Sequence, residues 1–78
     1  MKEILETIVK NIVENQEAVS ITEKEEADKV VLEVEVAAED MGRVIGKQGK
    51  IANSIRTLIK ALAKREHKKV SVDFKDRS

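Results

Sequence analysis

The three glycines of the chain lie close together, with basic residues between and beside them. They belong to the segment Gly42-Arg43-Val44-Ile45-Gly46-Lys47-Gln48-Gly49-Lys50. Glycine adopts backbone conformations that other residues avoid, and it lets a ligand approach the main chain closely. A tight turn that leads into a helix leaves N–H groups without partners, and these suit an anion such as phosphate. The spacing therefore predicts an anion-binding turn at Gly46–Gly49, with positive charge supplied by Lys47 and Lys50.

A longer string around this turn resembles the signature of the KH domain, an RNA-binding module whose G-x-x-G loop clamps the nucleic-acid backbone. The string is Met41-Gly42-Arg43-Val44-Ile45-Gly46-Lys47-Gln48-Gly49-Lys50-Ile51-Ala52. An apolar pair precedes the loop, and a lysine lies inside it. The string is similar to that of the small bacterial single-KH proteins of the KhpA type, and the resemblance extends over nearly the whole chain.

The resemblance implies a groove that holds about four nucleotides of single-stranded RNA. The glycines would admit the sugar–phosphate backbone, and the polar residues at the loop tip would contact phosphates. Two cations would add charge at the rim, and aliphatic side chains would form a floor for the bases. The implied RNA-binding residues are Arg43, Val44, Ile45, Gly46, Lys47, Gln48, Gly49, Lys50 and Ile51.

The resemblance also implies a biological role and partners. Proteins of this type act as small post-transcriptional regulators or RNA chaperones, and they form homodimers or pair with a second KH protein, of the KhpB type. A protein-interaction module that dimerises, with weak or absent RNA binding, is the alternative function. The sequence does not say which surface would dimerise.

Simpler roles compete with the RNA-binding ones. The aliphatic residues beside the loop also suit the core, and Gly42 suits close helix packing. Arg56, Lys60 and Lys64 form a stripe that is solvated as readily as it binds a ligand, so it carries less weight than the loop lysines. His67 reads as a linker residue.

The net charge is zero, but it is unevenly distributed. Residues 1–42 contain four basic and 12 acidic residues, a net charge of −8, whereas residues 43–69 contain nine basic residues and one acidic residue, a net charge of +8. Solvated helix faces and a polyanion partner explain this pattern equally well on charge alone. The position of the basic segment at the glycine turn favours the polyanion.

Hydrophobic periodicity predicts an α-β-β-α-α-β order. The expected elements are a helix over 2–15, strands over 19–26 and 29–37, a short helix over 39–45, a helix over 50–65 and a strand over 69–74. The helix over 50–65 should bury an apolar stripe of Ile51, Ile55, Leu58, Ile59 and Leu62, with Arg56, Lys60 and Lys64 nearly opposite it. Glu39 and Asp40 lie in the first turn of the short helix, where the helix dipole favours acidic side chains. The first two strands should form an antiparallel hairpin, and the two-helix crossover should leave the last two parallel. The expected fold is α+β, a three-stranded mixed sheet with helices on one face, which resembles the type II KH arrangement.

The 78 residues should form one domain, with a tail at about 75–78 that need not be ordered. There is no cysteine for a disulfide or a zinc thiolate site, and no metal or cofactor is predicted. Neither a signal peptide nor a long apolar run is present, which predicts a cytoplasmic protein without a membrane partner.

An enzyme is not predicted, because no acid–base or nucleophile constellation is visible. A nucleotide-binding P-loop is excluded by spacing. Gly42 and Gly46 are separated by three residues rather than four, and Gln48 stands where Ser or Thr should bind Mg²⁺.

Overall fold

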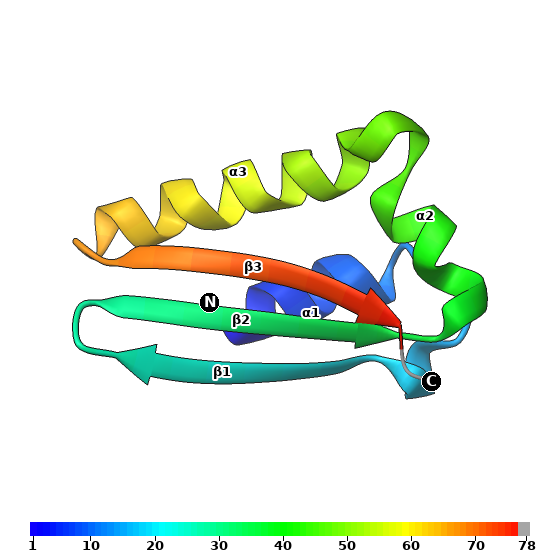
Figure 1. Cartoon of the computed structure of the whole chain (residues 1–78), viewed down its shortest axis with the longest axis horizontal. Coiled ribbons are helices and arrows are strands. Elements are labelled where there is room, and N and C mark those ends of the chain that lie inside the picture. The colour runs from blue at the N-terminus through cyan, green and yellow to red at the C-terminus, as the bar shows by residue number, and fades with distance from the viewer. Residues whose placement is uncertain (77–78) are drawn as a thin grey trace.

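β2 (Lys29–Val36) is the central strand of a three-stranded sheet, and its valine and glutamate residues alternate between the two faces of that sheet. In the computed structural model, which describes residues 1–76, the side chains of Val30, Leu32, Val34 and Val36 are buried. The glutamates between them point to the other face, where they are half-buried. One face of the sheet therefore carries the core and the helices, as predicted (Figure 1).

The two outer strands pair with β2 in opposite senses. β1 (Ser20–Glu26) is antiparallel to β2 and is joined to it by a turn at residues 27–28. β3 (Lys69–Asp76) is parallel to β2, as expected for a two-helix crossover. β3 runs two residues beyond the predicted end, because its last two residues pair with the end of β2. The tail predicted at 75–78 is thus described only as far as Asp76, and residues 77–78 lie outside the described part of the chain.

Residues 1–76 form three α-helices: α1 (Lys2–Lys10) and α3 (Lys50–Arg65) pack on the sheet, and α2 (Met41–Ile45) packs against α3. Short 3₁₀ turns occupy residues 16–18, 38–40 and 47–49. Figure 1 shows α3 running along β3, with α2 and the connecting turn at one end of the molecule. None of the helices in residues 1–76 is long and apolar enough to cross a membrane. The predicted α+β order is confirmed.

α1 is shorter than predicted: it ends at Lys10 rather than at residue 15. The Asn11 side chain donates to the Thr7 carbonyl oxygen at 2.7 Å, and the chain then turns. Farther on, the backbone N–H groups of Glu14 and Asn15 donate to the carboxylate of Asp40 instead of to helix carbonyls. A contact with a residue 25 positions away therefore overrides the local helical periodicity.

The predicted faces of α3 need two corrections. Ile51 and Leu58 were expected in the apolar stripe, but their exposed fractions are 38% and 48%, while Ile55 and Ile59 are buried. Arg56 was expected on the wet face, yet it is half-buried against β3. The buried face of α3 is thus turned toward β3 relative to the prediction, because that helix packs beside an edge strand rather than over the middle of the sheet.

The face of the sheet away from the helices carries a small ion-pair network. Glu33 lies between Lys24 and Lys75, at 3.6 and 3.3 Å. The hydrogen bond from Lys75, and then the charge of Lys24, lower the pKa of Glu33, and the same bond raises the pKa of Lys75. A lowered carboxyl pKa stabilises the fold above its unfolded-state pKa, and that contribution disappears as the pH falls through the folded-state pKa. The raised pKa of Lys75 acts in the opposite sense: its contribution disappears only as the pH rises through the folded-state pKa.

We expect Glu33→Gln to lower the urea midpoint slightly at about pH 7 and to have a smaller effect in acid, because protonation of the wild-type carboxyl as the pH falls through its lowered pKa removes the interaction. Added salt should shrink the difference at the higher pH. Glu26→Gln is the control, because Glu26 is an exposed strand glutamate with no ion pair in the described residues. Equal effects of Glu33→Gln at both pH values would contradict this account.

Candidate nucleic-acid interface

The turn between α2 and α3 has backbone angles that require its glycines. Gly46 ends α2 with φ 69° and ψ −173°, a region that is open essentially to glycine alone. Gln48 and Gly49 follow in the left-handed region, with φ of 56° and 76°. The N–H of Gly49 donates to the carbonyl of Gly46 at 3.4 Å, which closes the turn at the start of α3.

Gly46 also lies in close contact with α3. A Cβ atom at this position would lie 2.6 to 2.9 Å from three side-chain atoms of Ile51. At Gly49 the nearest atom would be the Asn53 amide nitrogen at 3.8 Å, and at Gly42 nothing lies within 4 Å. The close helix packing considered for Gly42 is therefore absent. Gly46 is the glycine that the local structure needs most.

The tip of the turn is polar, charged and open to solvent. Lys47, Gln48 and Lys50 are exposed. Within the described residues, neither lysine of the turn forms an ion pair. Ile45 and Ile51 flank the turn, each with 38% of its surface exposed. The structure thus brings two free cations and two accessible aliphatic side chains together at one end of the molecule.

Two of the other predicted site residues, Val44 and Arg43, are less available to a ligand than the residues at the tip of the turn. Val44 is fully buried, so its side chain supports the turn from within the core. Arg43 contacts the Glu14 carboxylate at 2.8 Å and the Asp40 carboxylate at 3.5 Å, although half of its side chain remains exposed. Any phosphate contact by Arg43 would have to compete with Glu14.

Sequence reasoning missed the role of Asp40. It was expected to favour a helix N-terminus by its charge alone, but its side chain makes no cap hydrogen bond to α2. Its two carboxylate oxygens accept the backbone N–H groups of Glu14 and Asn15, at 3.2 and 3.0 Å. Asp40 is the one buried charged side chain in residues 1–76, and it joins the start of α2 to the segment after α1. No sequence pattern indicates this burial, although the Asp40/Arg43 spacing of three is typical of a helical ion pair.

A second missed feature lies where α3 meets β3. The Nε group of Arg56 donates to the carbonyl of Val72 at 3.0 Å, and one terminal nitrogen donates to Asn53 at 3.1 Å. The guanidinium group lies 5.3 Å from the centroid of the Phe74 ring, within cation–π range. The single aromatic side chain of the protein is therefore partly covered by Arg56 and half-buried.

A G-x-x-G turn between two helices, beside a mixed sheet of αββααβ order, defines a KH domain of the type II arrangement. The sequence matches the family described as KhpA/KhpB, KH domain, over residues 2–74. The chain belongs to this family.

Relatives from several bacteria cover nearly the whole chain. The protein named RNA-binding protein KhpA from Clostridium acetobutylicum is 51% identical over 74 residues, which are 95% of this chain and 99% of that protein. Proteins of the same name from Caldanaerobacter subterraneus subsp. tengcongensis and Chlamydia trachomatis are 49% and 40% identical, again over 95% of this chain and over 99% and 95% of the relatives. The names of these relatives describe RNA-binding proteins rather than enzymes.

Proposed function

We propose that this chain binds single-stranded RNA through the Gly46–Gly49 turn and acts as a small post-transcriptional regulator or RNA chaperone. The observation that carries the proposal is the turn itself: a glycine-dependent backbone with exposed Lys47 and Gln48 at its tip. Relatives that cover nearly the whole chain are named RNA-binding proteins, which supports the same function.

The surroundings of the turn suit a short, sequence-tolerant RNA segment. Phosphates would meet Lys47 and Lys50, and bases would meet the exposed side chains of Ile45 and Ile51. Phe74 is partly covered by Arg56, so stacking of bases on an aromatic platform is not the main source of affinity. About three phosphate contacts would give a log–log salt slope near −2.

Fluorescence anisotropy of a labelled, mixed-sequence single-stranded RNA tests this proposal. We expect the variant Lys47→Asp, Gln48→Asp to bind at least about tenfold more weakly than the wild type at low salt, because it places negative charge where phosphates would lie. The matched control is Lys2→Asp, Gln16→Asp, which makes the same charge change at two exposed positions away from the turn. Equal binding by wild type and loop variant would overturn the proposal.

The loop variant should keep its fold. Both side chains are exposed, and Gln48 already has the left-handed conformation that aspartate tolerates better than most residues. The circular-dichroism spectrum and the urea midpoint should therefore remain near those of the wild type. A loss of the folded signal would show that the loop tip supports the domain and would remove this variant as a probe of binding.

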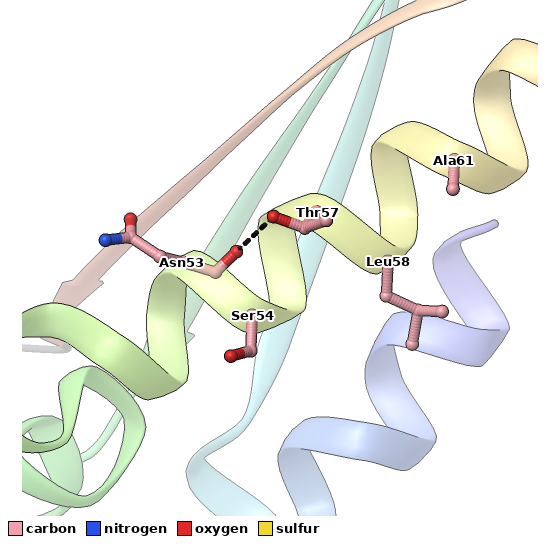
Figure 2. A pocket seen from close by; sticks show the side chains of 5 residues that line it. All are labelled: Asn53, Ser54, Thr57, Leu58 and Ala61. Atoms are coloured by element: carbon pink, nitrogen blue, oxygen red, sulfur yellow. Dashed lines mark hydrogen bonds between the residues drawn. The ribbon is translucent and has the colours of Figure 1, made fainter.

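Self-association is a second candidate function, and a specific surface favours it. Leu58 of α3 has 48% of its surface exposed, and it lines a shallow hollow with Asn53, Ser54, Thr57 and Ala61 (Figure 2). The hydroxyl groups of Ser54 and Thr57 donate to carbonyls of the same helix, so this surface offers few unpaired polar groups. A two-fold dimer would place Leu58 of one copy near Leu58 of the other.

We expect the wild type to sediment as a dimer and the Leu58→Lys variant to sediment more as a monomer. The variant should keep the folded circular-dichroism spectrum, because the position is half exposed. Thr22→Lys, at an exposed position on β1, is the control. A wild type that is monomeric at every concentration would contradict the homodimer and leave pairing with a second KH protein, of the KhpB type, to be tested by co-purification.

A further inference from the structure

α3 contains five basic residues and no acidic one. The basic residues are Lys50, Arg56, Lys60, Lys64 and Arg65. α1, by contrast, carries both signs, and its Lys10 and Glu6 form an ion pair at 2.9 Å. Across residues 1–76, carboxylates pair with Lys10, Lys24, Arg43, Lys68 and Lys75, but with no cation of α3. The positive charge of this helix is therefore uncompensated within the described protein.

Three of these cations share one flank of α3. Arg56, Lys60 and Lys64 are four residues apart, so they follow one another along the same side of the helix, and we call them the α3 stripe. The bond from Arg56 to the Val72 carbonyl identifies that side as the one facing the free edge of β3. Leu58 lies on a different side of the helix, whereas Asn53, which lines the same hollow, accepts a hydrogen bond from Arg56 at 3.1 Å, so the α3 stripe borders the candidate dimer surface at Asn53.

The α3 stripe continues from the glycine turn. α3 begins at Lys50, directly after the turn, and from Lys50 to Lys64 the helix rises about 21 Å. Figure 1 shows α3 leading away from the turn along β3. An RNA strand held at the glycine turn therefore meets further unpaired cations if it runs along this side of α3.

The spacing of the two exposed lysines is unfavourable for the isolated helix. Lys60 and Lys64 are four residues apart, where like charges repel one another. Both side chains are exposed, and neither is needed for the core. The negative phosphates of a polyanion reduce this repulsion. Each phosphate that a lysine neutralises also releases counterions from the nucleic acid, which adds to the affinity.

We propose that RNA longer than the segment held at the turn continues along α3, with Lys60 and Lys64 contacting phosphates beyond the clamp. This inference rests on the proposed RNA-binding function and extends the binding site. It requires contact with the backbone only, so it adds affinity without sequence preference.

The test compares two single-stranded RNAs, one of about four nucleotides, the length that a G-x-x-G loop clamps, and one of about 12. For Lys60→Gln, Lys64→Gln, we expect about tenfold weaker binding of the longer RNA at low salt and less than about twofold change for the shorter one. The salt slope for the longer RNA should become shallower by about 1.4, since two phosphate contacts are lost. Lys2→Gln, Lys24→Gln removes two exposed lysines, one on α1 and one on the face of the sheet away from the helices, and should change neither affinity.

The outcomes separate this inference from the function on which it rests. If the wild type binds neither RNA, or if the loop variant binds as well as the wild type, the proposed function fails and the extended site fails with it. If binding depends on the loop but Lys60→Gln, Lys64→Gln leaves the longer RNA unaffected, or weakens both RNAs equally, the clamp stands and the extension is wrong. If this variant changes only the sedimentation behaviour, the α3 stripe contacts an acidic protein surface, and the inference is likewise overturned.

Discussion

Gly46→Ala should destabilise the domain by about 3 kcal/mol, because two unfavourable effects act at one position. The backbone there has φ 69° and ψ −173°, where an alanine is strained. The new Cβ atom would also lie 2.6 Å from Cγ1 and 2.9 Å from Cβ of Ile51. The Cβ of Ile51 is fixed by the backbone of α3, so no rotation of that side chain relieves the contact.

The other two glycines supply graded controls for this prediction. Gly49→Ala meets no close atom but keeps a left-handed φ of 76°, so it should cost about 1 kcal/mol. Gly42→Ala lies within α2, with nothing within 4 Å of the added atom, and it should stabilise the domain by up to about 1 kcal/mol.

Thermal unfolding followed by circular dichroism measures the series. For a domain of this size, the expected loss at Gly46 corresponds to a fall in Tm of roughly 15 °C. Gly42→Ala should raise the Tm by a few degrees. If the Gly42 and Gly46 variants shifted Tm in the same direction and by similar amounts, the geometric distinction between the two glycines would be wrong.

Asp40→Ala should destabilise the domain by a similar amount, about 3 kcal/mol, for an electrostatic rather than a steric reason. The substitution removes the acceptor for the N–H groups of Glu14 and Asn15 and also takes one partner from Arg43. Part-buried donors without an acceptor retain their desolvation cost, which is why losing a carboxylate with several partners costs more than losing one ordinary hydrogen bond.

Two further substitutions show whether the carboxylate itself is responsible. Asp40→Asn keeps the shape but turns an NH₂ group toward one of the two N–H donors, so its effect should be intermediate. Glu39→Ala changes an exposed carboxylate in the same 3₁₀ turn and should shift stability by less than about 0.5 kcal/mol. Urea unfolding provides the free energies. Equal losses at positions 39 and 40 would contradict the assigned role of Asp40.

These two residues act at opposite ends of α2. Asp40 ties the start of this five-residue helix to the segment after α1, and Gly46 packs its end against α3. Between them, Val44 enters the core. Such a short helix has few intrahelical hydrogen bonds of its own, so these contacts hold it in place. The position of the candidate RNA clamp therefore depends on one buried carboxylate and one glycine.

The elements themselves were predictable from local chemistry. Valine–glutamate alternation indicated β2 and its buried face, and the bounds predicted for α3 agree with the structure at both ends. The mixed sheet was predictable from the lengths of the connections. The short turn between β1 and β2 allows only antiparallel neighbours, whereas the two-helix crossover between β2 and β3 is long enough to make them parallel. The glycine turn was predictable from residue type, because glycine tolerates backbone angles, such as those at Gly46, that other residues avoid.

The tertiary structure decided which side chains remain available. Periodicity placed Ile51 and Leu58 in the core, yet both are exposed, since α3 lies beside an edge strand and the sheet covers less than the full apolar stripe. The composition of the basic segment does not indicate which of its cations form ion pairs. The tertiary structure shows that Arg43 forms an ion pair with Glu14, whereas the lysines of α3 form no ion pair within residues 1–76. Backbone conformation depends mainly on neighbours in sequence, whereas burial and charge pairing depend on residues brought together from far along the chain. The sequence by itself therefore determined which strands, helices and glycine turn form, and tertiary contacts decided where α1 ends and which charges and apolar side chains a partner can reach.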